Sequence, residues 1–311
     1  MHRFALVLAL AALILTVPAR IPAAQPTLLF GAGLSLTGRD AREGRLTQQG
    51  YEIWKAYANA HGGIPVGKER YLVEIKYYDD ETNPQTAVRL AERLIDQDHV
   101  SFLLGPYGTA STFSASAVSE RRHVPMVVTN GPASAVFDRG FRYIFGVQTP
   151  AKRYLEGIVA MALSMKPAPK TLAVASANLA FPIEVGQGAA DYAQAHGMQI
   201  VYNQKFPAAA SDVSPVVAQI KAANPDVVLI AGYLQDSLLF QKGFKEQNVN
   251  ARIFGYSVGP DTPDFREALG RDANFVFGGT QWTPTMTYKG RSGFYATAPE
   301  YAKAFQKTFG I

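Results

Sequence analysis

The chain has 311 residues, of which 48% are hydrophobic and 18% charged, so its composition is neither low-complexity nor disordered, and its length favours two lobes over one compact core. Its 30 basic and 25 acidic side chains are scattered, and basic residues gather only in short clusters such as Arg121-Arg122, which argues against a nucleic-acid-binding protein. Cysteine is absent, which excludes disulfides and thiol chemistry.

Residues 1–24 have the pattern of a secretory signal peptide. Met1-His2-Arg3 forms a positive start, residues 4–17 an apolar stretch, and Val17-Pro18-Ala19 or Pro22-Ala23-Ala24 a small-residue exit. The stretch is short for a transmembrane helix, and no later run of about 18 apolar residues follows. We therefore expect a periplasmic protein whose mature chain has no stable membrane insertion and, without cysteine, no lipoprotein anchor.

Strand and helix patterns alternate through residues 25–147. Asn83 followed by Pro84 is typical of a helix N-cap and first helical residue, and Gly62-Gly63 ends the helix before it. Such alternation predicts a parallel sheet with helices on both faces. The predicted strands are 27–36, 71–78, 100–104, 124–129 and 143–147, and the helices between them are 45–61, 84–97 and 109–120.

A second series of the same kind runs through residues 148–281. Two series with junctions near 148–150 and 281–284 predict two Rossmann-like lobes joined by a hinge of several strands, with residues 282–311 returning to the first lobe. Because the chain stops soon after the last helix, we also expect a C-terminal truncation. The strands are 171–176, 199–202, 227–231, 253–256 and 275–279, and the helices 152–164, 184–196, 213–222, 234–247 and 299–309.

The stretch LLGPYGTAS, residues 103–111, is a candidate anion site. A strand, a glycine-bearing turn and a helix start together offer free backbone N–H groups to a phosphate or a carboxylate. Gly31-Ala32-Gly33 fits the beginning of a dinucleotide-binding motif, but Leu36 stands where the third glycine is needed, and no P-loop is present. An NAD-type doubly wound enzyme is therefore a disfavoured alternative.

Catalytic and metal-binding patterns are weak along the whole chain. The five histidines contain no pair with zinc-ligand spacing, and the serine-rich segment 111–116 lacks the G-x-S-x-G elbow of a serine hydrolase. Asp79-Asp80-Glu81 is explained by a turn at the end of a strand. We therefore expect no catalytic residue, no metal and no cofactor.

Several segments together resemble the branched-chain-amino-acid-type periplasmic binding proteins, the solute receptors of ABC importers. They are GLSLTGRDAREG, ANAHGGI, YYDDETNPQTAVRLAERLI, LLGPYGTAS and RGFRYIFG, and the resemblance runs from about residue 27 to the end of the chain. It implies the type I two-lobe fold, a small carboxylate or amino-acid ligand, permease subunits as partners, and a missing C-terminal part that would cross the hinge a third time.

The resemblance also implies a set of ligand-binding residues. In the first lobe a Ser/Thr hydroxyl and backbone amides hold the ligand carboxylate at the start of the helix after the third strand, and free N–H groups at a helix start favour an anion. In the second lobe, Tyr233 lies at the carboxyl end of a predicted strand, where open α/β sheets bind ligands. Phe181 is explained equally well as a ligand contact or as a packing residue. The implied set is Tyr107, Gly108, Thr109, Ala110, Asn130, Gly131, Ala133, Phe181, Tyr233 and Ser257.

Ser257 departs from the family pattern. Receptors for leucine-like amino acids place a glutamate there to hold the ligand ammonium, and burying an ammonium without an acid costs desolvation energy. Asp261 replaces that acid if its loop folds inward, and Arg42 and Glu43 stand where the family often has an aromatic residue at the edge of the pocket. We expect a hydrophobic amino acid as ligand, with an amine-free aromatic or keto carboxylate as the alternative.

Overall fold

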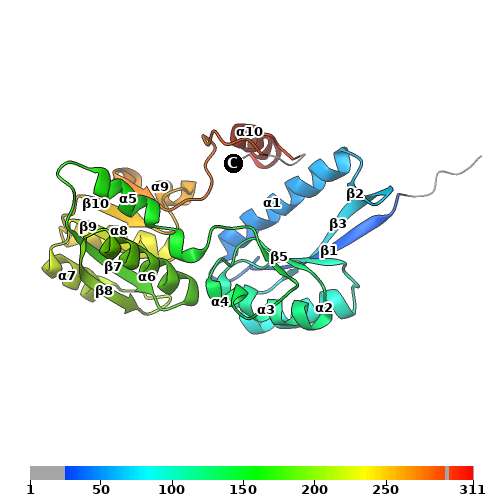
Figure 1. The fold of residues 1–311 in the computed structure, drawn as a ribbon, viewed down its shortest axis with the longest axis horizontal. Coiled ribbons are helices and arrows are strands. Elements are labelled where there is room, and N and C mark those ends of the chain that lie inside the picture. Colours follow the sequence, from blue (N-terminus) through cyan, green and yellow to red (C-terminus); the bar gives the residue numbers. More distant parts are fainter. Residues whose placement is uncertain (1–24, 291–293, 311) are drawn as a thin grey trace, which may run out of the picture.

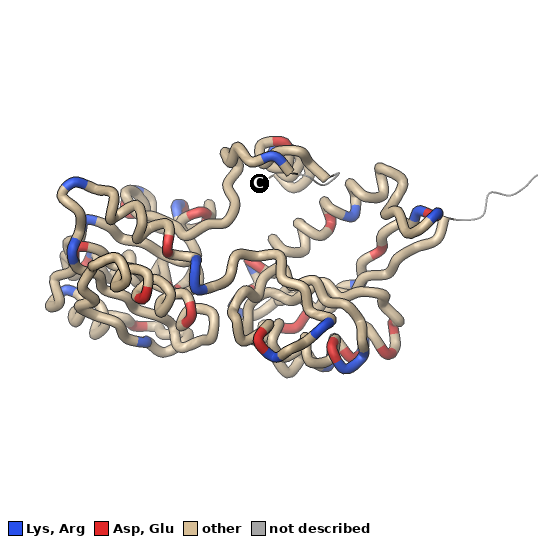
Figure 2. Tube along the Cα trace, viewed as in Figure 1, with Lys and Arg blue, Asp and Glu red and all other residues tan. Residues whose placement is uncertain are grey.

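The computed structural model describes residues 25–290 and 294–310, so the predicted signal peptide lies outside the described residues. Two separate sheets, each flanked by helices, form two lobes (Figure 1), which confirms the predicted α/β architecture. Figure 2 shows charged residues of both signs spread over both lobes. Within the described part of the chain, no helix is long and apolar enough to cross a membrane.

The first sheet has six strands in the order β2-β3-β1-β4-β5-β6. All neighbouring pairs are parallel except β2 and β3, which form an antiparallel hairpin across Gly67. The strands are β1 (Thr27–Leu34), β2 (Ile64–Val66), β3 (Glu69–Asp79), β4 (Phe102–Leu104), β5 (Met126–Val128) and β6 (Ile144–Gly146). The helices of this part are α1 (Ala41–Ala60), α2 (Pro84–Asp96), α3 (Thr109–Arg122) and α4 (Ser134–Phe137).

The second sheet has five parallel strands in the order β11-β10-β9-β7-β8. The strands are β7 (Thr171–Ala177), β8 (Gln199–Phe206), β9 (Val227–Ala231), β10 (Ile253–Tyr256) and β11 (Val276–Gly278). The helices that follow β6 are α5 (Glu156–Ser164), α6 (Ala180–Ala195), α7 (Ser214–Ala223), α8 (Leu234–Glu246), α9 (Pro263–Leu269) and α10 (Ala298–Phe309), with 3-10 turns η1 (Ala151–Arg153) and η2 (Gly270–Ala273).

Strand β9 shows why the sheet of the second lobe is stable. All five of its residues are fully buried, and successive side chains point to opposite faces. Val227, Leu229 and Ala231 pack into the core formed with α5 and α6, whereas Val228 and Ile230 pack into the core formed with α7, α8 and α9. A strand buried on both faces is what a parallel sheet between two helical layers requires.

The predicted cap of α2 is confirmed. The Asn83 side chain accepts hydrogen bonds from the backbone N–H groups of Gln85 at 2.9 Å and Thr86 at 3.1 Å, and Pro84 is the first helical residue. The first residue of a helix makes no hydrogen bond within the helix through its N–H, so a proline there loses nothing. Asn83 and Pro84 together therefore define where the helix begins.

Three predicted helix starts are wrong by several residues. Helix α1 begins at Ala41 and not at residue 45. Helix α6 begins at Ala180 and not at residue 184. Pro182 is compatible with this start because it lies in the first turn, where backbone N–H groups have no partner within the helix. The segment predicted as a helix from residue 152 is divided into η1 and α5, which begins at Glu156. Phe181, in the first turn of α6, and Tyr154, between η1 and α5, line the space between the lobes.

The two segments that cross between the lobes lie side by side. The backbone N–H of Thr149 donates to Gln281 Oε1 at 2.6 Å, which joins the first crossing to the second. Beyond the second crossing, the chain returns to α1, where the Tyr57 ring packs against Phe294 at 4.9 Å and Tyr295 at 5.0 Å between centroids. A hydrogen bond therefore connects the two crossing segments of the hinge to each other.

Candidate ligand-binding site

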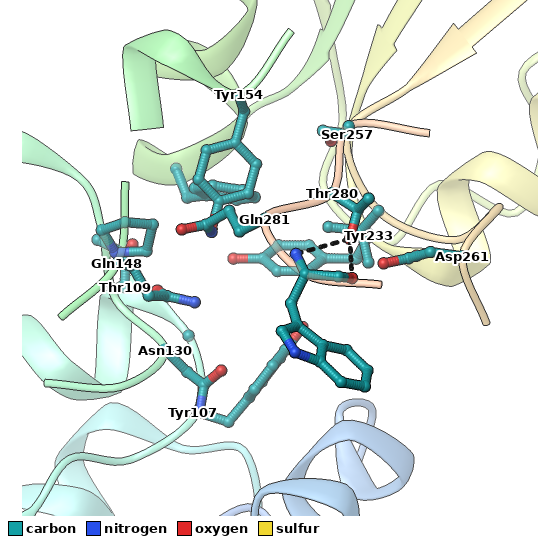
Figure 3. A pocket seen from close by; sticks show the side chains of 16 residues that line it. Tyr107, Thr109, Asn130, Gln148, Tyr154, Tyr233, Ser257, Asp261, Thr280 and Gln281 are labelled. Carbon is teal, nitrogen blue, oxygen red and sulfur yellow. Dashed lines mark hydrogen bonds between the residues drawn. The ribbon is translucent and has the colours of Figure 1, made fainter. Parts of the chain in front are cut away.

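A cavity of about 310 Å³ lies between the lobes, within the size range of small-molecule sites (Figure 3). Its walls come from the carboxyl ends of strands in both sheets and from the two crossing segments. Seven of the ten predicted residues line it, namely Tyr107, Gly108, Thr109, Asn130, Phe181, Tyr233 and Ser257. Sequence segments more than 100 residues apart are thus brought to one place.

The other three predicted residues are placed elsewhere. Ala110 lines a neighbouring hollow of about 410 Å³, which also includes Thr109 and Tyr233. Ala133 is fully buried in the core cluster of the second lobe, and Gly131 is buried against Thr112, whose Oγ1 would lie 2.6 Å from a Cβ atom added at Gly131. Gly131 and Ala133 therefore do not line the cavity but pack beside residues that do, and a role for them in ligand binding stays a prediction.

The start of α3 presents unpaired hydrogen-bonding groups to the cavity. Gly108 takes φ 81° and is the N-cap, but no side chain caps the helix. The Thr109 residue is only 3% exposed, and its hydroxyl oxygen is buried with no hydrogen-bond partner among the described residues. A 14-residue helix directs its positive end at this point, so an anion here would satisfy both the helix start and the unpaired hydroxyl.

Aromatic rings form the apolar walls. Tyr107 comes from the first lobe and lies 6.3 Å from the ring of Tyr233 in the second lobe. Phe181 stands between Tyr233, at 5.7 Å, and Tyr154, at 5.0 Å in an edge-to-face arrangement. Burial raises the pKa of Tyr107, Tyr154 and Tyr233, so their hydroxyl groups stay neutral near pH 7. The walls therefore offer apolar contact together with neutral hydrogen-bonding groups.

Ser257 uses its hydroxyl group within the protein. The residue is 1% exposed, and its Oγ donates to the carbonyl of Gly232 at 2.8 Å and accepts from the N–H of Gly232 at 2.9 Å. The next residue, Tyr233, is held by its N–H bond to Asp236 Oδ2 at 2.8 Å. Ser257 thus lines the cavity while it fixes the turn that presents Tyr233.

Residues of the hinge, absent from the predicted set, also line the cavity. The amide of Gln281 bonds both the Thr149 N–H and the Tyr154 hydroxyl, and Gln148 carries a buried side-chain oxygen without a partner among the described residues. Their positions in the sequence could have indicated them, since Gln148 and Gln281 both belong to the predicted crossing segments near 148–150 and 281–284. Pro132, Tyr154, Val258, Gly279, Thr280 and Trp282 complete this unpredicted lining.

Among the described residues, one charged side chain lines the cavity. Asp261 is the one acidic residue that lines it, and no Lys, Arg or His does so in the described part of the chain. The loop after β10 thus folds inward, as the sequence required for Asp261 to reach a ligand. No group of three or more His, Asp or Glu side chains in residues 25–290 and 294–310 is placed to hold a metal ion.

Two α/β lobes around a cavity lined by both of them define a ligand-binding protein of the two-lobe class. The chain belongs to the periplasmic binding protein family, whose model matches residues 28–310. This confirms the family resemblance that the sequence motifs carry, and the chain is a solute-binding protein.

Named relatives match the chain in sequence, and solved structures match it in fold, over most of its length. Leu/Ile/Val-binding protein homolog 7 of Brucella suis is 27% identical over 95% of this chain and 75% of that protein. The fold matches a leucine-binding protein from Thermotoga maritima with a TM-score of 0.76 at 18% identity, over 92% of this chain and 77% of that one. It also matches a solute-binding protein from Rhodopseudomonas palustris in complex with 3,4-dihydroxybenzoic acid, with a TM-score of 0.73 at 23% identity, over 91% and 74%.

Proposed function

We propose that this chain captures a small, partly hydrophobic carboxylate in the periplasm and delivers it to the permease of an ABC importer. The observation that carries the proposal is the buried Thr109 hydroxyl, which lacks a partner among the described residues at the start of α3. A ligand carboxylate accepts the hydrogen bond that this hydroxyl has to give and meets the positive end of the helix. Family membership supports binding and transport over catalysis.

The two lobes have different tasks in this proposal. The first lobe, residues 25–147, binds the carboxylate at Gly108 and Thr109. The second lobe, residues 148–281, closes over the apolar body with Phe181 and Tyr233, while the hinge segments bend. The signal-peptide pattern of residues 1–24 supports the periplasmic location. No cofactor or metal takes part.

The ligand class is either a hydrophobic amino acid or an amine-free aromatic carboxylate. Relatives named for Leu, Ile and Val support the first class. The second is favoured by a specific observation, because the Ser257 hydroxyl is occupied by Gly232 and the acid of the cavity wall, Asp261, stands four residues beyond it in the loop after β10. A structural relative binds 3,4-dihydroxybenzoic acid, which has no amine.

The test compares Thr109→Ala with Thr109→Ser in calorimetric titrations against benzoate, 4-hydroxybenzoate, a branched keto acid and L-leucine. A hydrogen bond to a charged group contributes about 1.5–3 kcal/mol, so Thr109→Ala should raise the Kd of each bound carboxylate about 10- to 100-fold. Thr109→Ser keeps the hydroxyl and should stay close to the unmodified protein. Unchanged affinity in Thr109→Ala would place the carboxylate elsewhere, and no binding of any carboxylate would refute the proposed function.

A further inference from the structure

The cavity is electrically polarised along its length. Thr109 and the start of α3 lie on one side, and Asp261 lies on the opposite side, with the Tyr233 ring between them (Figure 3). The first end is positive through the helix, and the second is negative through the carboxylate. Because no basic side chain among the described residues lines the cavity, nothing in its wall neutralises Asp261.

The position of Asp261 differs from that of an acid at the end of β10. Strand β10 ends at Tyr256, and Ser257, the next residue, directs its hydroxyl to the Gly232 backbone. Asp261 comes four residues later, in the loop before α9, and its side chain is exposed at the cavity wall. Its charge still acts inside the cavity, since burial chiefly raises the pKa of Tyr154 and the Asp261 carboxylate adds to the effect.

We propose that Asp261 is a specificity-determining residue that accepts a hydrogen bond from a hydroxyl or amino group at the end of the ligand opposite its carboxylate. The inference rests on the proposed function, because it takes the ligand carboxylate to be bound at Thr109. It adds a requirement on the ligand itself: the donor is separated from the carboxylate by the length of the apolar body, which lies among Tyr107, Phe181 and Tyr233.

This requirement sorts ligand classes by geometry. An α-amino acid has its ammonium on the carbon next to the carboxylate, so its two charged groups lie together at one end of the ligand, whereas Thr109 and Asp261 lie on opposite sides of the Tyr233 ring. A ring with a carboxylate and a para hydroxyl or aminomethyl group presents the two groups at opposite ends. A ring with two para carboxylates brings a second negative charge to Asp261, and like charges repel. The cavity thus selects carboxylates with a distal donor and rejects distal acids.

The experiment measures Kd by calorimetry for the unmodified protein, Asp261→Asn and a control, Asp191→Asn, which removes one exposed charge of α6 outside the cavity. The ligands are benzoate, 4-hydroxybenzoate, 4-(aminomethyl)benzoate, terephthalate and L-leucine. In the unmodified protein, a distal hydroxyl or ammonium should tighten binding about tenfold over benzoate, a moderate value for a hydrogen bond to an exposed charge. Terephthalate should bind more weakly than benzoate.

Asp261→Asn should bring both distal donors to within about twofold or threefold of benzoate and relieve the rejection of terephthalate, since the asparagine oxygen is uncharged. Asp191→Asn should keep the ranking of the unmodified protein. An unchanged ranking in Asp261→Asn, with benzoate still bound, would overturn the role of Asp261 and leave the proposed function standing. Loss of L-leucine binding alone in Asp261→Asn would assign the residue to an α-ammonium and also overturn the inference. No binding of any ligand by the unmodified protein would refute both.

Discussion

Ser257 and Thr109 are both buried hydroxyl-bearing residues of the cavity wall, yet their hydroxyl groups have opposite roles. Ser257 has both its donor and its acceptor capacity occupied by Gly232, whereas the Thr109 hydroxyl has no partner among the described residues. An unpaired buried hydroxyl costs free energy in the unliganded protein and regains it when a ligand accepts its hydrogen bond. The difference separates a residue that builds the site from one that binds in it.

Replacing Ser257 by alanine should therefore act through Tyr233. The change leaves the N–H and C=O of Gly232 without their side-chain partner in a buried turn, so the free energy of unfolding should fall by about 1–3 kcal/mol. Ligand affinity should fall as well, because the turn that presents Tyr233 loses its bonds to Ser257 and keeps only the bond from the Tyr233 N–H to Asp236. Denaturant unfolding and calorimetry check both effects, with Ser101→Ala, at an exposed serine, as the control. A stability equal to that of the control would contradict the positioning role.

Sequence motifs predicted the strand-end residues of the cavity better than its hinge residues. Thr109 and Tyr233 follow strands of a parallel sheet, where the carboxyl ends of strands mark ligand sites. Gln148 and Gln281 belong to irregular crossing segments, where no periodicity tells which side chain points inward. Their orientation depends on contacts between segments 132 residues apart in the sequence, such as the bond from Thr149 to Gln281.

At the scale of helices and strands, residues typical of helix ends explain why some element boundaries were predicted and others were missed. Helix α2 has Asn83 and Pro84 at its start, and its predicted start is right. Helix α9 has the same kind of signal, Thr262 as N-cap followed by Pro263, but it is short and was not predicted. Strand β2 has three residues that include Pro65 and depends on pairing with β3, which local sequence does not reveal.

The cap of α2 can be tested directly. Asn83→Ala removes the side-chain oxygen that accepts from the N–H groups of Gln85 and Thr86, and the loss of such a cap costs about 1 kcal/mol. Asn83→Asp keeps an acceptor at the same place and should retain most of the stability. Thermal and denaturant unfolding of the three proteins measure the difference. Equal stability of Asn83→Ala and the unmodified protein would show that the cap contributes nothing measurable.

For the whole molecule, the described residues join the lobes at the cavity, at the hinge and through further contacts, among them two polar contacts between helices. Arg42 of α1 and Asp264 of α9 form an ion pair, with Arg42 Nε at 3.0 Å from Asp264 Oδ1. The Ser134 N–H and hydroxyl, at the start of α4, donate to Glu184 Oε2 of α6 at 2.7 and 3.0 Å. Both contacts connect a helix of one lobe to a helix of the other, so they stabilise this arrangement of the lobes relative to a more open one.

Breaking the Arg42–Asp264 pair should weaken ligand binding although neither residue lines the cavity. Both side chains are about one-third exposed, and exposed ion pairs contribute about 0.2–1 kcal/mol, so Asp264→Asn should raise Kd up to about fivefold. The matched control is Asp272→Asn, which breaks an ion pair with Lys245 inside the second lobe. An equal effect of the two variants on Kd would contradict a contribution from the contact between lobes.

The same contact predicts a pH dependence with a definite sign. The hydrogen bond from Arg42 to Asp264 lowers the pKa of that carboxyl, so closure favours its charged form. The affinity advantage of the unmodified protein over Asp264→Asn should be full above the ordinary carboxyl pKa and disappear as the pH falls through the lowered pKa of Asp264. Titrations of both proteins with one ligand across this range measure the ratio of their Kd values. A ratio that stays constant, or grows as the pH falls, would show that the charge of Asp264 does not hold the lobes together.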